Sequence, residues 1–440
     1  VLRGEGFTEA ETVAKFLTDE KMQEKVKGQV LWVDEAGLLG THDMTRILEI
    51  ATQQNARVIL GGDTRQHASV VRGDALRIVN KVAGIKTAEV SKIYRQQNEE
   101  YRAAVEDLAK GHVREAFEKL DGMDCIHEVD PLKPNTEIVD DYVEALKKGK
   151  SALVISPTHA QGEDVTEAIR KRLRQDGLLG KKEITATQLK NLNLTEAEKG
   201  DPRNLQAGQI IQFTQNAAGC KRGSVWLIAQ KEKGGLYLKN AEGDTRPIPS
   251  NHADRFNVYA EQEIHLSKGD RVMVTQNGFD ANKRRLNNGD TFEVVSVSKA
   301  GKVVLQNKVS RETYELPKNY GHIAHAHCVT SHASQGKTVD KVFIYQPAGT
   351  FPATDAKQFY VSVSRGKESV RIYTDAKEEL LQHASELGER KSALELLGKG
   401  KLHKEFVAQM QRQEKANHEK TKDQDKSTRN QKQIDHGTDR

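Results

Sequence analysis

Short apolar runs alternate with helix-patterned segments in the first part of the chain. Residues 29–33 and 58–60 predict buried strands, and a third short strand is expected at 87–90. Apolar residues at helical spacing predict helices over 7–27 and 42–54. Because the apolar runs end in polar residues, the alternation predicts a parallel α/β sheet with its site at the carboxyl ends of the strands.

A second α/β unit is predicted farther along the chain, and a segment with the pattern of short β-strands interrupts it. A helix expected near 98–120 closes the first domain, and a helix near 136–148 leads to the strands of the second unit, which are expected at 152–155, 342–345 and 370–373. Residues 206–316 instead carry short alternating stretches separated by Gly, Asn and Asp turns, typical of small antiparallel barrels. These stretches are Ile210–Phe213, Val225–Ala229, Leu236–Leu238, Arg271–Val274, Thr291–Val297 and Val303–Leu305.

These patterns divide the chain into a first α/β domain, a split second α/β domain, an inserted β region and a tail. The expected bounds are 1–120 for the first domain, 121–185 and 318–376 for the second, 186–317 for the insertion and 377–440 for the tail. A helix is expected over 376–397. The mixed-charge end of the tail predicts partial disorder.

Composition narrows the function classes. Hydrophobic residues make up 36% and charged residues 30% of the 440 positions, as in a globular protein. No apolar stretch approaches the roughly 20 residues that span a bilayer, and no basic-then-apolar leader argues for secretion, so we expect no membrane insertion. Three widely spaced cysteines suit a reducing cytoplasm. The net charge of +5 permits a nucleic-acid partner without requiring one.

Two adjacent acids follow the first predicted strand. Asp34 and Glu35 come directly after Leu31–Val33. In nucleotide hydrolases, acids in this position hold Mg²⁺ and orient the attacking water. The alternative is an acidic pair that caps the next helix through its dipole.

Three further motifs favour the nucleotide-hydrolase interpretation of the acid pair. Gln66 follows the next strand, where its amide could sense a γ-phosphate. Tyr94 and Arg95 offer an aromatic plane for a base and a cation for phosphate. Arg365, far downstream, could neutralise transition-state charge as an arginine finger. Each also has a plainer interpretation, as a turn, a stacked surface pair or an ordinary salt bridge.

The motif series resembles a known family. VDEAG, GDTRQ, YRQ, HCVTSHASQGKT and YVSVSRGK resemble the helicase motifs of superfamily 1, in its RecD-like branch. GDTRQHASVVRGDALRI resembles the motor region of the MobF-type conjugative relaxase–helicases of plasmids. The resemblance covers about residues 1–375.

The resemblance implies a fold and an activity. The fold is two RecA-like domains with ATP bound between them, the first truncated at its amino end, and SH3-like β material inserted in the second. The activity is that of an ATP-dependent DNA helicase, a P-loop NTPase that moves 5′→3′ on single-stranded DNA. Conjugation proteins of the relaxosome or type IV secretion system would be further partners.

The resemblance also implies residue roles. Asp34 would hold Mg²⁺, Glu35 would activate water, and Gln66 would couple γ-phosphate to DNA. The residues that would contact the nucleotide are Arg95, Arg365, Tyr94 and Gly336. Those that would contact or sense single-stranded DNA are Ser156, Pro157, Thr158, Thr330, His332 and Gln335.

A phosphate-binding lysine loop is missing from the expected place. Gly149-Lys150-Ser151 and Gly336-Lys337-Thr338 contain the right triplet, but Glu144 and Ser331 stand where the first glycine belongs. The required order is strand, glycine loop, helix. We therefore expect a fragment whose loop precedes Val1, and which alone binds ATP weakly and does not turn it over. The alternative is a non-catalytic scaffold that binds single-stranded DNA.

A histidine-rich stretch offers a third hypothesis. His325 and His327 alternate on one strand face, and His322 or His332 could complete a metal site of a metal-dependent nicking endonuclease. No tyrosine pair on a helix accompanies them, and the stretch runs straight into the helicase-like motif. A structural strand or a DNA-proximal role remain the alternatives.

A basic cluster lies in the β insertion. Lys283, Arg284 and Arg285 fall in an expected hairpin with its turn at Asn287–Gly289. The cluster either contacts DNA phosphates or forms a solvated basic loop.

Overall fold

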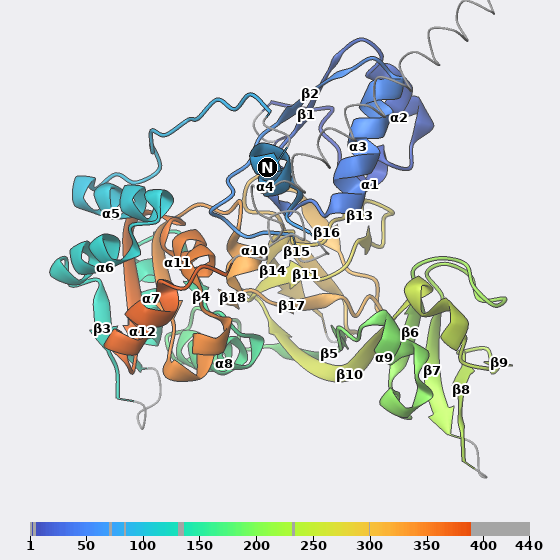
Figure 1. Cartoon of the computed structure of the whole chain (residues 1–440). Helices are drawn as coiled ribbons and strands as arrows, with labels where there is room; N and C mark the ends of the chain where they lie inside the picture. Colours follow the sequence, from blue (N-terminus) through green and yellow to red (C-terminus); the bar gives the residue numbers. More distant parts are fainter. Residues whose placement is uncertain are drawn as a thin grey trace, which may run out of the picture. The chain divides into compact units, whose positions relative to one another are not determined.

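The chain forms two compact units. The computed structural model describes residues 2, 6–69, 73–82, 85–130, 136–230, 234–298 and 300–388. One unit comprises Val1–Ser91 with Leu387–Arg440, and the other comprises Lys92–Glu386 (Figure 1). The predicted tail from residue 389 onward lies outside the described residues.

The first unit is built on a short parallel sheet. Strands β1 (Val30–Val33) and β2 (Arg57–Leu60) pair in parallel, joined through α3 (Thr41–Gln53). The strands predicted at 29–33 and 58–60 and the helix predicted at 42–54 are confirmed. The core comprises Val33, Ala36, Met44, Ile47 and, from α4 (Ala75–Val82), Ala75 and Leu76.

Two predictions in this unit are wrong. The helix expected over 7–27 is two short helices, α1 (Val13–Phe16) and α2 (Glu20–Lys25). Asp19 separates them, because its side chain accepts from Met22 N (3.1 Å) and caps a new helix. The strand expected at 87–90 has no regular structure. Its pattern alternates, but no strand pairs with it, and Val90 is 91% exposed.

The second unit centres on a five-stranded sheet in the order β18–β4–β19–β20–β3, parallel throughout. Its strands are β3 (Ile126–Glu128), β4 (Ala152–Ile155), β18 (Cys328–Val329), β19 (Val339–Tyr345) and β20 (Gly366–Thr374). Strands from before and after the β insertion lie side by side. The prediction that the insertion splits this α/β unit is therefore confirmed.

Helices cover both faces of this sheet. They are α5 (Glu99–Lys110), α6 (Val113–Gly122), α7 (Thr136–Lys147), α8 (His159–Gln175), α10 (Ser331–Ser334), α11 (Ala356–Val363) and α12 (Lys377–Ala384), with the 3-10 turn η5 (Ala348–Ala353). Side chains of α5, α6 and α11 pack with Leu153 and Ile155, whereas those of α7 and α8 pack with Val154. Because α5 and α6 join this core, the units divide at Ser91/Lys92 rather than at the expected 120.

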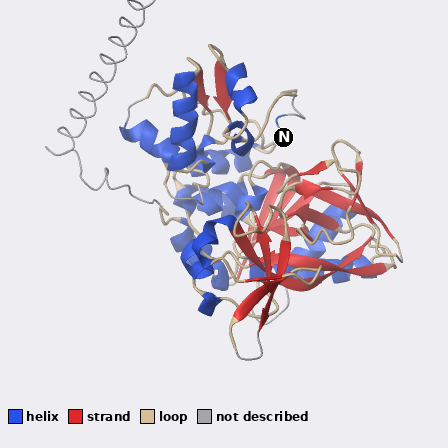
Figure 2. Ribbon diagram, turned by 90° about the vertical axis from the view of Figure 1, so that its right-hand side faces the viewer, coloured by secondary structure: helices blue, strands red, loops and turns tan. Residues whose placement is uncertain are grey.

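The insertion consists of two antiparallel sheets and a small hairpin (Figure 2). The strand orders are β5–β10–β6–β7–β8–β9 and β16–β15–β14–β11–β17, and β12 pairs with β13. The strands are β5 (Glu183–Asn191), β6 (Ile210–Phe213), β7 (Val225–Gln230), β8 (Leu236–Lys239), β9 (Thr245–Arg246), β10 (Phe256–Ser267), β11 (Arg271–Val274), β12 (Gly278–Phe279), β13 (Arg285–Leu286), β14 (Thr291–Val297), β15 (Val303–Gln306), β16 (Thr313–Glu315) and β17 (Ile323–His325). Short helical turns α9 (Glu196–Gly200), η3 (Pro202–Asn204) and η4 (Ser250–Arg255) connect them.

All six short strands predicted for the insertion are present, and β5, β9, β10 and β16 were not predicted. No helix within the described ranges is long and apolar enough to cross a membrane. Cys125, Cys220 and Cys328 are free thiols.

Candidate functional site

The acid pair lies at the carboxyl end of β1. Asp34 is exposed and Glu35 is half-buried in a left-handed conformation (φ 51°, ψ 38°). For a residue with a Cβ this conformation costs about 1–2 kcal/mol. Glu35 precedes the 3-10 turn η2 (Ala36–Leu38) without a side-chain capping hydrogen bond, and α3 is preceded by Gly40. The helix-capping interpretation of the pair thus gains no support.

The loop after β2 holds the acid pair in place. Gly61 N donates to Val33 O and Ala36 N donates to Gly61 O, each at 2.8 Å. A Cβ at Gly62 would lie 3.2 Å from Ala36 N and 3.1 Å from Gly37 N. Only glycine allows this close approach of the two loops.

Gln66 belongs to the same sheet edge. Its Nε2 donates to Asp63 Oδ2 (3.3 Å), and its Oε1 is buried without a hydrogen-bond partner among the described residues. Because β1 and β2 are parallel neighbours, Asp34, Glu35 and Gln66 all follow strand ends at one edge. This is the placement that the sequence predicted for them.

Two predicted arginines meet in the second unit. Arg95 Nη1 donates to Ser364 O, and Arg365 Nη2 donates to Ser364 Oγ, both at 2.8 Å. Gln96 Nε2 secures the contact by donating to Ser364 O (3.1 Å) and Gly366 O (2.9 Å). Arg365 is only 2% exposed, so its side chain would have to swing outward to reach a phosphate.

Tyr94 presents an open aromatic face. Its side chain is 76% exposed, and Lys92 Nζ lies 5.0 Å from the ring centroid. The cation beside the ring is thus Lys92, not the Arg95 of the predicted pair, and the exposed ring is accessible to a base.

The predicted DNA-contact loops share one edge of the parallel sheet. Ser156, Pro157 and Thr158 follow β4, and Thr330 follows the neighbouring β18. Ser156 N donates to Val329 O (3.0 Å), and Thr330 Oγ1 accepts from Ala333 N (3.3 Å) at the start of α10. His332 and Gln335 follow in the same segment, which ends at Gly336 with φ 75°.

A buried polar network underlies α10. Ser331 Oγ donates to Gln358 O (3.2 Å), and Ser362 Oγ donates to Ser331 Oγ (3.1 Å). Gln358 Nε2 donates to Ser362 Oγ (3.0 Å) and Gln346 Nε2 donates to Gln358 Oε1 (2.9 Å). The sequence reasoning missed these positioning residues. Their only signal was polar side chains within apolar segments.

The two glycine–lysine–hydroxyl triplets have the wrong surroundings for phosphate binding. Gly149–Ser151 connects α7 to β4, and Lys150 Nζ pairs with Glu368 (2.6 Å). Gly336–Thr338 connects α10 to β19. Both run from helix to strand, the reverse of a phosphate loop.

His325 and His327 pack beside a buried carboxylate. Asp270 accepts from Arg170 (2.8 and 3.0 Å), and His327 Nε2 lies 3.3 Å from it. Burial alone would raise the pKa of Asp270, but hydrogen bonds from His327 and Arg170 outweigh it and lower that pKa. Burial also lowers the pKa of His325 to about 3. Among the described residues, no three His, Cys, Asp or Glu side chains form a group that could hold a metal ion, which gives the nicking hypothesis no support.

The basic cluster lies on a hairpin in which β12 pairs with β13, so the turn of this hairpin falls at 280–284 and its predicted place, Asn287–Gly289, is wrong. Arg284 forms an ion pair with Asp280 (2.7 Å) and lies 4.4 Å from the Tyr314 ring centroid. Lys283 and Arg285 are exposed.

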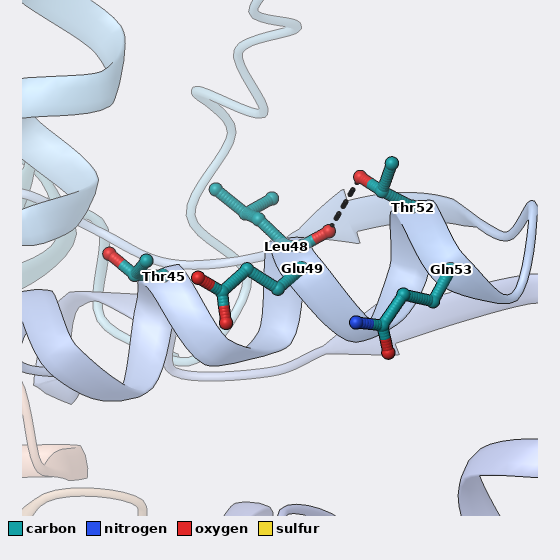
Figure 3. A pocket seen from close by; sticks show the side chains of 5 residues that line it. All are labelled: Thr45, Leu48, Glu49, Thr52 and Gln53. Carbon is teal, nitrogen blue, oxygen red and sulfur yellow. Dashed lines mark hydrogen bonds between the residues drawn. The ribbon is translucent and has the colours of Figure 1, made fainter. Parts of the chain in front are cut away.

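A shallow pocket elsewhere in the first unit is a weaker candidate for a binding site than the strand-end loops. Its lining comes from α3 alone: Thr45, Leu48, Glu49, Thr52 and Gln53 (Figure 3). Thr52 Oγ1 donates to Leu48 O (2.8 Å) and Glu49 pairs with Arg46 (2.8 Å). A single helix face of this kind lacks the converging polar groups of a binding site.

Two family models match the chain at the places where these motifs lie. An AAA domain model matches residues 1–131, and a UvrD-like helicase C-terminal domain model matches residues 325–373. The resemblance to superfamily 1 helicases of the RecD-like branch is thereby confirmed. The narrower resemblance, to the helicase region of MobF-type conjugative relaxases, is confirmed by the similar proteins described next.

The multifunctional conjugation protein TraI of Escherichia coli is 22% identical over 425 residues, which cover 83% of this chain and 23% of TraI. The RecBCD enzyme subunit RecD of Mycobacterium tuberculosis (strain CDC 1551 / Oshkosh) is 25% identical over 372 residues, covering 82% of this chain and 51% of RecD. The chain spans about a quarter of the length of the conjugation proteins that it matches. The chain is also similar to a solved structure of a Pif1 helicase from Bacteroides in complex with ADP-AlF3 and single-stranded DNA. The match covers 87% of this chain and 76% of the Pif1 chain, at 15% sequence identity and a TM-score of 0.34.

Proposed function

We propose that this chain is the motor region of an ATP-driven helicase or translocase that moves 5′→3′ on single-stranded DNA during conjugative DNA processing in the cytoplasm. The observation that carries the proposal is the edge formed by Asp34, Glu35 and Gln66 at the ends of two parallel strands. The matched helicase models and the conjugation relatives support it.

The residues of the first unit suit nucleotide hydrolysis. The exposed Asp34 carboxylate is a hard oxygen ligand of the kind Mg²⁺ prefers, and would hold that ion. Glu35 would accept a proton from the attacking water. Gln66 would donate from its amide nitrogen to the γ-phosphate, and its buried Oε1, which has no partner among the described residues, would accept from the attacking water. Bound Mg²⁺–ATP would supply the phosphoryl group.

The residues of the second unit suit phosphate sensing and DNA contact. Arg95, and Arg365 once its side chain has moved outward, would provide cations for nucleotide phosphates, and Tyr94 would provide a plane for adenine. The two loops after β4 and β18 would contact the strand, through Pro157, Thr158, Thr330, His332 and Gln335. In conjugation the partners would be single-stranded DNA and proteins of the transfer machinery.

We further propose that these 440 residues alone do not hydrolyse ATP, because both candidate lysine triplets connect helix to strand. The motor is tested in a protein that joins this chain to a glycine-rich phosphate loop, on oligonucleotides blocked at one end by streptavidin. ATP-dependent displacement from the 3′ end is expected. Displacement from the 5′ end would reverse the direction.

A second candidate is a scaffold that binds single-stranded DNA without hydrolysis; the observation behind it is that both lysine triplets connect helix to strand. Retained DNA binding with no displacement from either end, and no hydrolysis by the joined protein, would favour the scaffold.

A further inference from the structure

The β12–β13 hairpin is rigidly braced. Asp280, whose side chain is fully buried, accepts from Arg284 N (2.8 Å) and Asn282 N (2.9 Å) and forms the ion pair with the Arg284 guanidinium. Arg284 also donates to Thr313 O and covers the Tyr314 ring. Of the three clustered cations, Arg284 therefore stabilises the hairpin through these contacts.

The base of the hairpin is equally constrained. A Cβ at Gly278 would lie 2.5 Å from the Tyr320 ring, so the chain passes directly against that ring. Tyr320 Oη in turn donates to Gln276 O (2.7 Å). The hairpin therefore keeps one orientation on the β insertion without support from a ligand.

The outward face of the hairpin combines an aromatic ring with cations. Phe279 and Arg285 are direct cross-strand partners and share a face, whereas the next residue, Leu286, is fully buried on the other face. Phe279 is 60% exposed. Lys283 is exposed at the turn, with φ 63°.

An exposed phenylalanine on a rigid, positively charged hairpin suits a specific class of ligand. The ring can stack on a nucleobase, and stacking does not depend on sequence. The flanking cations fit phosphates on either side of that base. A duplex hides its base faces, so the ligand is a single strand.

We propose that the β12–β13 hairpin is a base-stacking contact for single-stranded DNA, in which Phe279 stacks on a base and Lys283 and Arg285 contact the neighbouring phosphates. The proposal rests on the DNA-binding part of the proposed function. It adds Phe279 to the predicted contacts and reassigns Arg284 to a positioning role.

The test is fluorescence anisotropy of the whole chain with labelled oligothymidylate and with the same strand carrying abasic sites. Phe279→Ala should weaken binding to the normal strand by about 5-fold or more and leave binding to the abasic strand unchanged. Phe279→Tyr should restore affinity. Lys283→Gln with Arg285→Gln should weaken both, and should reduce the slope of log affinity against log salt by about 0.7 for each cation that no longer neutralises a phosphate.

Matched controls are Val309→Ala, which removes an exposed apolar side chain of the same insertion, and Arg222→Gln, which removes an exposed cation of the other sheet. Both should bind like the unaltered chain. If the unaltered chain binds and Phe279→Ala binds equally well, or loses affinity for both strands alike, the stacking proposal is overturned and the proposed function stands. If the unaltered chain binds neither strand, both are overturned.

Discussion

At the scale of single residues, the sequence predicted which residues follow the strand ends but not the contacts that hold them. The position of Asp34 and Glu35 at a strand end could be predicted because the two acids directly follow an apolar run. The sequence could not predict that Glu35 adopts a left-handed conformation, or that Arg365 is buried. Ala36, next to Glu35, donates to Gly61 O, and Ser364, next to Arg365, accepts from Arg95 and Gln96. Local sequence does not encode these tertiary contacts.

Gly62→Ala tests the close approach of the two site loops. The added methyl would crowd Ala36 N, Gly37 N and the Leu76 side chain (2.9 Å) and force the loops apart. We expect a loss of about 1–3 kcal/mol in unfolding free energy of the first unit, measured by denaturant titration. Gly122→Ala is the control, since nothing lies within 4 Å of a Cβ there. Equal stability of the two variants would contradict the account.

His322 gives a prediction on pH. The ring packs against Tyr259 and Tyr320, both nitrogens lack hydrogen-bond partners among the described residues, and burial lowers the pKa of His322 to about 4. The unfolded chain, with a pKa near 6.5, binds more protons between these values, so His322 costs stability as pH falls from about 6.5 to 4.

His322→Phe should therefore leave stability at pH 7 nearly unchanged and flatten the acid side of the pH–stability curve. Thermal unfolding between pH 4 and 7 measures this. An unchanged acid slope in the variant would show that His322 does not remain neutral when buried.

At the scale of secondary-structure elements, prediction succeeded where one face of an element is buried. Strands such as β11 and β14 have the expected bounds because buried apolar residues alternate along them. The long β10 was missed because Glu261, Gln262 and Glu263 are exposed and interrupt that alternation. The strand expected at 87–90 failed for the opposite reason: its pattern alternates, but no neighbouring strand covers it.

Asp270→Asn tests how the insertion is fixed to the parallel sheet. Asp270 immediately precedes β11 and pairs with Arg170 of α8, so the variant leaves the half-buried Arg170 with one partner fewer. We expect a loss of about 3–5 kcal/mol at pH 7. Because the pKa of Asp270 is lowered on folding, its contribution is present above the unfolded value near 4 and lost as pH falls below it.

The difference in unfolding free energy between Asp270→Asn and the unaltered chain should thus shrink below pH 4. Asp254→Asn, which alters an exposed ion pair with Arg255 (3.6 Å), should change stability by less than about 1 kcal/mol. A pH-independent difference for Asp270→Asn would refute the ion-pair explanation.

At the scale of the whole molecule, the chain is two units joined by an exposed segment. Residues 85–91 are exposed and have no regular structure. The sequence placed the boundary later, at 120, because α5 and α6 are helices like those before them. Only packing shows that their apolar faces join the second sheet.

Limited digestion tests this division. Trypsin should cut after Lys86 or Lys92 in the exposed segment and leave Lys150, which is ion-paired, intact. Mass spectrometry should find a fragment that begins at Thr87 or Ile93. Early cleavage inside 136–230 with no cut at the junction would contradict two separate units.

The measurement that tests the central claim most directly is ATP hydrolysis stimulated by single-stranded DNA, in a protein that joins this chain to a phosphate loop. If Glu35 is the base that activates water, Glu35→Gln should lower the stimulated rate by about 100-fold or more and leave DNA affinity unchanged. A variant that keeps its DNA-stimulated hydrolysis would contradict the account, because the acid pair would then not be the hydrolytic centre.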